Sequence, residues 1–518
     1  MTKHKTLHLF WAAFPLSLLI LLLQVMPGLA QRAANKPDSV DTWTFGPNLP
    51  STVVRAVGVF FPANGKFYAM GGRSADGTGN DLLHPAEYNP GTNTWTLKAA
   101  MFSDNHVDNM GCGVLTQGGT PYIFCVGGSF GGGADASPRV ARYDPVADVM
   151  TDLTAADNWP GDANLIRLPG GHAVVGNKLY IIGGFEINVD MSHEVWVFDP
   201  NAAVGSRWTR LADYPADRGY IPTAAYGPLI FTAGGSLWDG TTIHDTVDSF
   251  RYNTLTDTWT AITNIPRVVA ETRALNVYGT VWVMGGGRDA PNPNNEVDIY
   301  DPRCNTWTVS TQPFVTPRRN FPTDTDGGSR VWLAGGYAPA VPDSTMEIYG
   351  APAVTSAVSR KVHGGAGTFD VPLPLNGPAG VECRTGPTYT MVVTFSTSVT
   401  VASATVTCGT GSVGSISGSG TATITVNLTG VTDVQRITVT LNSVSDGTNT
   451  GNIPIFMGVL VGDVNANNTV NASDVSLTKS KVGQTVDSTN FREDVNAGGT
   501  ITATDVTIVK SDVGHALP

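Results

Sequence analysis

Short apolar runs recur along residues 41–350, and each run leads directly into a pair of glycines. The first glycines of six such pairs follow one another at intervals of 56, 56, 51, 51 and 50 residues. After each pair comes a variable polar loop, then an aromatic residue at a turn, as in Tyr88-Asn-Pro, and in most copies a run that contains Trp. Apolar runs this short, bounded by turn residues, predict β-strands rather than helices. The six runs end at Gly72, Gly128, Gly184, Gly235, Gly286 and Gly336.

This repeat predicts a closed propeller. Four twisted strands can bury their faces only by stacking against neighbouring blades, so each copy predicts one blade. With a period near 50 residues, glycine pairs and Trp strands, residues 41–350 resemble a six-bladed kelch β-propeller. The sixth copy stops at Tyr349 without its Trp strand, whereas an isolated Trp43 strand precedes the first copy. We therefore expect the N-terminal strand to complete the last blade and leave no open sheet edge.

Beyond Gly350 the pattern changes. All eleven tryptophans lie at or before Trp332, and residues 351–460 instead alternate Thr, Val and Ser with a period of two, as in Tyr389–Phe395. Such strands, separated by Gly and Ser turns, predict a β-sandwich. The segment resembles the immunoglobulin-like or fibronectin-type spacers of exported bacterial proteins.

The first 30 residues indicate a secretory signal peptide. Lys3 and Lys5 form a basic start, an apolar run spans Leu9–Leu23, and small residues at Gly28–Ala30 supply a cleavage site. A retained membrane anchor is the alternative, but the run is short for a span of about 20 residues. We expect a secreted, extracellular protein whose mature chain has no membrane span, with a linker at residues 31–40.

Charge and cysteine content narrow the function classes further. The formal net charge is -12 and Lys/Arg clusters are absent from the sequence, which argues against a nucleic-acid partner. The five cysteines lack C-x-x-C spacing, so zinc and thioredoxin-like chemistry are not expected. Oxidation in an exported chain predicts the pairs Cys112–Cys125 and Cys383–Cys408, with Cys304 left over.

The last 58 residues contain a duplicated calcium-loop pattern. Oxygen-bearing side chains occupy positions 1, 3, 5, 9 and 12 of the segment Asp463–Asp474, which is the spacing of an EF-hand-type loop. A second copy begins 31 residues later at Asp494, and the two copies share twelve identities in 21 positions. The expected ligands of two calcium ions are Asp463, Asn465, Asn467, Thr469 (through its carbonyl), Asn471 and Asp474, and then Asp494, Asn496, Thr500, Thr502 and Asp505.

Two such loops, each followed by a short helix, resemble a type I dockerin domain across residues 461–514. The resemblance implies calcium binding and docking onto a cohesin module of a scaffold or surface protein. Loop positions 10 and 11, which select the partner in that family, are Ala472-Ser473 and Ala503-Thr504, and their similarity implies docking in either orientation. Gly498 departs from the pattern because it offers no side-chain ligand, so the second loop is expected to bind calcium more weakly.

The complete fold prediction is therefore all-β. We expect a signal peptide (1–30), a linker (31–40), a six-bladed kelch propeller (41–350), a β-sandwich (351–460) and a small α-helical, calcium-binding dockerin-like module (461–518).

The propeller should bind ligands at one mouth of its central channel, where inner strands converge. Cationic or titratable residues before each inner strand predict a pocket for a carboxylate or a sugar acid. The alternative is that the arginines brace adjacent blades through carbonyls and acids such as Glu271 and Asp324. The candidate residues are Arg55, His106, His172, Arg218, Tyr220, Arg273, Arg318 and Arg319.

Together these features predict an exported multimodular binding protein with a glycan or protein ligand. The alternative is a carbohydrate-active enzyme, either a glycoside hydrolase or one similar to the sialic-acid mutarotases, with its site at the channel mouth. The sequence supplies no catalytic residue for either. A copper site like that of galactose-oxidase-like enzymes is disfavoured because no Tyr-His pair is present.

Overall fold

The computed structural model describes Met1, residues 43–375, Gly377 and residues 379–518. The predicted signal peptide and linker therefore lie outside the described residues. Within the described part, no helix is long and apolar enough to cross a membrane.

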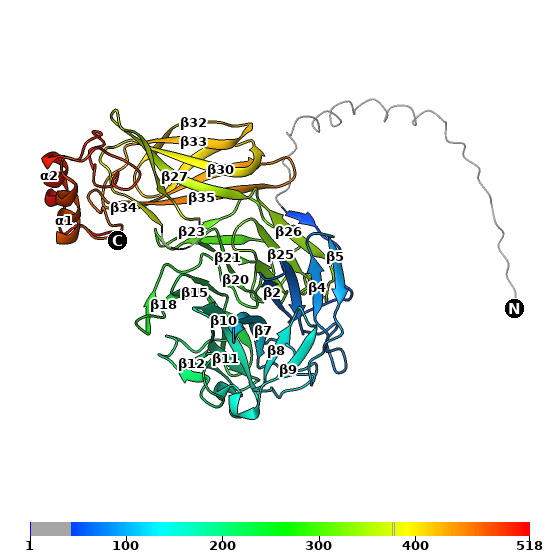
Figure 1. The fold of residues 1–518 in the computed structure, drawn as a ribbon. Coiled ribbons are helices and arrows are strands. Elements are labelled where there is room, and N and C mark those ends of the chain that lie inside the picture. Colours follow the sequence, from blue (N-terminus) through cyan, green and yellow to red (C-terminus); the bar gives the residue numbers. More distant parts are fainter. Residues whose placement is uncertain (2–42, 376, 378) are drawn as a thin grey trace, which may run out of the picture. The chain divides into compact units, whose positions relative to one another are not determined.

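Residues 43–350, here called the propeller, form six four-stranded antiparallel sheets within the described range (Figure 1). Each inner strand contacts the inner strand of the next blade, and β24 contacts β2, so the ring is closed. The first three blades are β2 (Val57–Phe61), β3 (Lys66–Met70), β4 (Ala86–Asn89) and β5 (Thr94–Leu97); β6 (Gly111–Gln117), β7 (Thr120–Val126), β8 (Val140–Asp144) and β9 (Val149–Asp152); and β10 (Arg167–Val175), β11 (Lys178–Glu186), β12 (Asp190–Phe198) and β13 (Trp208–Arg210). The last three are β14 (Thr223–Tyr226), β15 (Leu229–Ala233), β18 (Ser249–Asn253) and β19 (Thr258–Ala261); β20 (Ala274–Val277), β21 (Thr280–Met284), β22 (Val297–Asp301) and β23 (Thr306–Val309); and β24 (Thr323–Thr325), β25 (Arg330–Ala334), β26 (Met346–Gly350) and β1 (Trp43–Phe45). A small hairpin, β16 (Ser236–Trp238) with β17 (Ile243–Asp245), extends the fourth blade.

The glycine pairs are required by the backbone. Gly71 has φ +67°, and a Cβ at this position would lie 2.5 Å from the carbonyl oxygen of Val107 in the next blade. Only glycine combines a left-handed conformation with such a close approach at little cost. The first glycine of every pair has a positive φ, which explains why the pair recurs with the blades.

The sequence correctly predicted the closure of the ring. β1 pairs with β26 in antiparallel register, with Trp43 opposite Tyr349 and Phe45 opposite Glu347. Trp43 is 3% exposed and its ring packs against those of Phe314 and Tyr349.

Residues 351–460, here called the sandwich, form two sheets that share one apolar core. One sheet has the order β28-β27-β30-β33-β32, and the other β29-β35-β34-β31. An immunoglobulin-like identity for this segment stays a prediction. The strands are β27 (Val354–His363), β28 (Gly367–Pro372), β29 (Gly380–Glu382), β30 (Tyr389–Val399), β31 (Ser403–Cys408), β32 (Ser412–Ser417), β33 (Thr421–Thr429), β34 (Gln435–Ser445) and β35 (Thr450–Val459).

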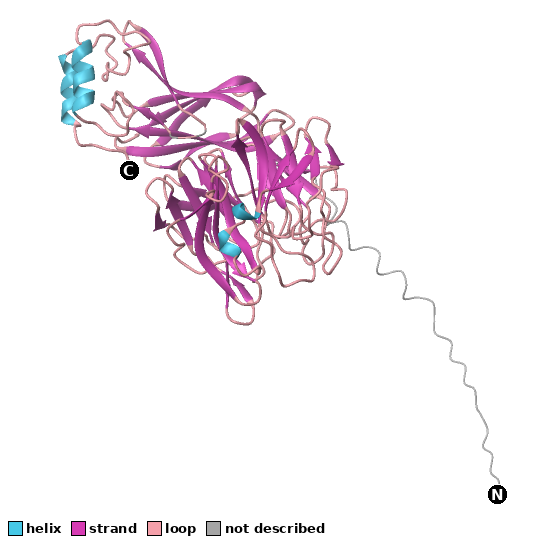
Figure 2. Cartoon of the chain, turned by 60° about the horizontal axis from the view of Figure 1, so that its bottom comes forward, coloured by secondary structure: helices cyan, strands magenta, loops and turns pink. Residues whose placement is uncertain are grey.

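Residues 461–518, here called the tail, carry two helices that lie side by side, α1 (Ala472–Lys481) and α2 (Ala503–Ser511) (Figure 2). The two loop–helix repeats exchange backbone hydrogen bonds. Val470 of the first loop pairs with Gly514 and His515 beyond α2, and Ile501 of the second pairs with residues beyond α1. Tail valines share a core with Val381 and Leu460 of the sandwich. The tail is therefore packed as one piece with the end of the sandwich.

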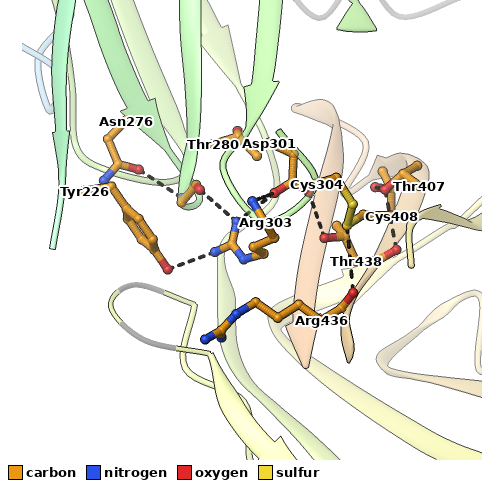
Figure 3. A network of polar contacts seen from close by, with 12 residues as sticks. Tyr226, Asn276, Thr280, Asp301, Arg303, Cys304, Thr407, Cys408, Arg436 and Thr438 are labelled. Atoms are coloured by element: carbon orange, nitrogen blue, oxygen red, sulfur yellow. Dashed lines mark hydrogen bonds and ion pairs between the residues drawn. A yellow bond between two sulfur atoms is a disulfide. The ribbon is translucent and has the colours of Figure 1, made fainter. Parts of the chain in front are cut away.

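One of the two predicted disulfides was wrong. Cys112–Cys125 is present, and Cys383 is a buried free thiol. Cys304 of blade five is bonded to Cys408 instead (Figure 3). Cys304 follows β22 in a turn, and this turn meets the end of β31, where Thr438 donates to Asp301 at 2.8 Å. Cys383 is nearer than Cys304 to Cys408 in the sequence. In the folded chain, however, the Cys383 side chain faces the tail, where its Sγ lies 3.6 Å from the carbonyl oxygen of Arg492.

Candidate functional site

The tail loops have the backbone shape of calcium loops. Residues at loop position 6, where a sharp turn ordinarily demands glycine, are Asn468 with φ +69° and Gly499 with φ +90°. Position 4 is left-handed too, at Ala466 and Ala497. Both loops therefore curl in the same way despite their differing residues at positions 5 and 6.

Backbone amides hold the carboxylates at positions 1 and 12. In the first loop, Asp463 accepts from the amides of Asn467 and Asn468 at 3.0 and 2.9 Å. Asp474 accepts from Asn465 and Asn471 at 3.3 and 3.0 Å. The second loop repeats this arrangement.

There Asp494 accepts from the amides of Gly498 and Gly499 at 2.9 and 2.8 Å. Asp505 accepts from those of Asn496 and Thr502 at 3.0 and 2.8 Å. Each loop thus brings its own two carboxylates together around a centre of its own.

The residues present fit a hard cation. All four carboxylates are fully buried, and among the described residues Asp463, Asp474 and Asp505 form no ion pair. Burial raises the pKa of Asp463, and the nearby Asp474 adds to the rise. A buried carboxylate without a cationic partner is costly, and carboxylate, amide and carbonyl oxygens are the ligands that calcium prefers.

Each loop ends as the N-terminal cap of a helix. Asn471 caps α1 and Thr502 caps α2, and in both helices the position-12 aspartate completes a capping box. The predicted partner-binding residues occupy the first turn of each helix and are all exposed: Ala472, Ser473, Ala503 and Thr504.

A ring of left-handed residues surrounds one mouth of the propeller channel. Two or three residues before the inner strand, one residue has a positive φ in five blades of the described range: Arg55, Asn109, Tyr220, Glu271 and Asn320. The amide of Asn109 donates to the carbonyl of Arg55, that of Arg55 to Asn320, and that of Asn320 to Glu271, at 2.7–2.9 Å. Hydrogen bonds between blades thus hold these side chains around the opening.

These residues line a cavity of about 80 Å³, here called the mouth cavity. Four of the predicted residues line it, namely Arg55, His172, Tyr220 and Arg273. His172 and Arg273 also line a second cavity of about 390 Å³ farther along the inner strands.

The electrostatics of the mouth cavity leave hydrogen-bond donors unused. Burial opposes the charge of Arg55, but Tyr220 and Glu271 outweigh it, so the pKa of this guanidinium rises. Burial and the neighbouring Arg273 lower the pKa of His172 well below its usual value, so the imidazole is neutral. Among the described atoms, Arg55 Nε, Asn109 Nδ2 and His172 Nε2 are buried without a hydrogen-bond partner.

The only carboxylate among the residues lining the mouth cavity is already paired. Glu271 bonds to Arg288 at 2.5 Å, to Asn320 at 2.9 Å and to Arg319. Burial alone would raise the pKa of Glu271, yet Arg288 and Arg319 lower it. The group is therefore a neutralised structural anion.

The other predicted propeller residues lie outside the mouth cavity. Arg318 is fully buried and bonds to Glu347 at 2.9 Å, and Arg218 bonds to Asp248 at 2.5 Å. His106 lies beside Asp104, and Arg319 stacks on Tyr337. For Arg318 and Arg319 the contacts are those of the bracing alternative.

Sequence reasoning missed Asn109 and Asn320 as lining residues. Their amides carry no charge, so a search for titratable groups passes over them. Aligning each copy on its inner strand would have placed both at the position of Arg55.

Comparisons with known proteins agree with the division of the chain into a propeller and a tail. Residues 461–514 match the family described as "Dockerin type I domain", and residues 270–312 match the family described as "Kelch motif". Over 48% of its length the chain is similar to "Kelch-like protein 25" of Xenopus tropicalis, at 25% identity and covering 40% of that protein. It is also similar to "Kelch-like protein terF" of Aspergillus terreus (27% identity, 48% and 52%) and "Beta-scruin" of Limulus polyphemus (25% identity, 47% and 26%). The aligned part spans about half or less of these relatives.

The chain thus combines kelch repeats with a dockerin type I module, a domain type that binds calcium and docks to cohesins.

Proposed function

We propose that this chain is an exported binding protein that docks, in the presence of calcium, onto a cohesin of a scaffold or cell surface. The supporting observation is the duplicated loop, because two buried carboxylates converge in each of its two copies. We assign one calcium ion to each loop. Each loop carries only two carboxylates, so its calcium affinity should be modest, which suits the millimolar calcium concentration outside cells.

The docking surface comprises the first turns of α1 and α2. Ala472 and Ala503 occupy equivalent exposed positions, each followed by a small hydroxyl residue. Small side chains let a partner approach the helix backbone closely. Because the two repeats are related by pseudo-symmetry, either helix offers the same surface, and docking occurs in two orientations.

Pull-down of the full chain by a recombinant type I cohesin tests this function. We expect retention in millimolar calcium and release in EDTA. The single variants Ala472→Glu and Ala503→Glu should each keep binding through the other helix, and the double variant should lose it. Thr489→Glu, at an exposed tail position outside both helices, is the matched control. Binding by the double variant, or equal binding in EDTA, would contradict the proposal.

For the propeller we propose ligand binding at the mouth cavity rather than catalysis. Unpartnered N–H groups of Arg55 and Asn109 suit an oxygen-rich ligand, above all a carboxylate on an acidic sugar or an acidic peptide. Glycoside hydrolysis ordinarily needs two carboxylates flanking the bond. The mouth cavity offers Glu271 alone, and its oxygens are held by arginines.

Glycan and acidic-peptide arrays probed with the full chain distinguish the two sources of a carboxylate. A charge-assisted hydrogen bond contributes about 1.5–3 kcal/mol, so Arg55→Met should weaken binding about 10- to 100-fold. Arg330→Met, at an exposed arginine of β25, should leave it unchanged. Binding of neutral glycans that is insensitive to Arg55→Met would refute this mouth assignment. Sugar release from a bound glycan would favour the enzyme alternative.

A further inference from the structure

A buried chain of polar side chains leads from the sandwich to the second calcium loop. It begins at Ser359, which donates to Glu382, and Glu382 accepts from Arg384 at 2.7 and 2.8 Å. Arg384 lies 3.0 Å from His363 Nε2, and His363 Nδ1 lies 2.8 Å from Asp494 Oδ2. All five side chains are fully buried.

The donor and acceptor atoms of these five side chains fix the direction of the hydrogen bonds between them. Arginine carries only donors, so His363 Nε2 must accept from Arg384. The proton of the neutral imidazole therefore lies on Nδ1, which donates to Asp494. Asp494 occupies position 1 of the second loop, so an imidazole of the sandwich orients a calcium-binding carboxylate of the tail.

The two loops differ at this point. Asp463, at the same position of the first loop, accepts only from amides of its own loop among the described residues. Asp494 has the same two amide donors and His363 in addition. Arg492 donates to the backbone carbonyls of Asp463 and Val464 in the first loop. Among the described residues, only in the second loop, which lacks a side-chain ligand at Gly498, does a side chain from outside donate to the carboxylate at position 1.

Glycines bring the sandwich and the second loop together. A Cβ at Gly364, in the turn after β27, would lie 2.4 Å from the carbonyl oxygen of Gly498. A Cβ at Gly499 would lie 2.8 Å from the carbonyl oxygen of His363. Gly364 of the turn and Gly499 of the loop therefore give the sandwich room to lie against the second loop.

We propose that the sandwich positions the second calcium loop through His363, and that this support makes up part of the affinity lost with the missing ligand at Gly498. His363 is a positioning residue: it holds Asp494 in the orientation that calcium needs and does not itself touch the ion. The inference rests on the proposed calcium sites. Groups that orient a metal ligand typically contribute 10- to 100-fold to metal affinity.

Calcium titration calorimetry of the full chain tests the proposal, with each loop measured alone. Asp463→Ala with Asp474→Ala silences the first loop, and Asp494→Ala with Asp505→Ala silences the second. With the first loop silenced, adding His363→Ala should lower calcium affinity about 10- to 100-fold. With the second silenced, the same change should leave affinity unchanged.

Further variants exclude a general loss of structure. Asparagine can present an N–H near the place of His363 Nδ1, so His363→Asn should restore most of the affinity. Arg360→Ala, at an exposed residue of the same strand, is the matched control. Gly364→Ala, which drives the turn away from the loop while keeping the imidazole, should weaken the second site.

Two outcomes would overturn the inference: unchanged affinity of the second loop in His363→Ala, or an equal fall at both loops. If the unaltered chain gives no calcium heat at either loop, the proposed calcium sites fail instead.

Discussion

Truncation of Trp43 tests whether the N-terminal strand holds the propeller closed. The side chain is 3% exposed and packs against Phe314 and Tyr349, with ring centroids 5.9 and 5.5 Å away. Its indole donates to the carbonyl of Gln312 at 3.2 Å. Replacement of a buried Trp by Ala costs about 3–5 kcal/mol.

The strand supplies its own control. Phe45 lies two residues away on β1 and is 59% exposed, so Phe45→Ala removes an aromatic ring at a cost within about 0.5 kcal/mol. At roughly 2–4 °C per kcal/mol for a large domain, Trp43→Ala should lower the propeller Tm by about 6–20 °C. Phe45→Ala should lower it by no more than about 2 °C.

Differential scanning calorimetry of the full chain measures both shifts on the propeller transition. Aggregation after heating should also begin earlier in Trp43→Ala, because loss of β1 exposes the edge of β26. Equal Tm shifts for the two variants would refute the reasoning, since they would mean that β1 contributes no core to the last blade.

The remaining predictions concern the tail and the cysteines. Asp463→Ala with Asp474→Ala should abolish one calcium-binding event in calorimetry and leave the other. In the unaltered chain, the second loop should be the weaker of the two sites. Two remaining events in the double variant would contradict the loop assignment. Peptide mapping without reduction should recover Cys304 linked to Cys408. Replacing both cysteines by Ser should destabilise the chain by about 4–5 kcal/mol for a crosslink of this length. Equal denaturation midpoints of the two proteins would show that the bond contributes nothing to stability. Burial raises the pKa of Cys383 to about 11, so iodoacetamide at mildly alkaline pH should label this thiol only after unfolding, and labelling of the folded chain would show that the site is open.

The propeller and the tail loops were predictable because their determinants are local in sequence. A glycine pair such as Gly71-Gly72 records a backbone conformation that every blade needs, so blade number and strand closure follow from spacing. The predicted calcium ligands of each loop lie within twelve consecutive residues. Asp463 and Asp494 could therefore be proposed as ligands from the spacing alone, and their calcium binding stays a prediction.

Tertiary structure alone decided the features made by residues far apart in the chain. Cys304 bonds to Cys408 across 104 positions because a turn of blade five meets the end of β31, and no spacing rule reports such a meeting. His363 reaches Asp494 across 131 positions in the same manner. The mouth cavity depends on blades closing in a ring, which sets Asn109 beside residues of other repeats. Local patterns fix backbone conformation, whereas contacts between elements depend on how whole sheets pack.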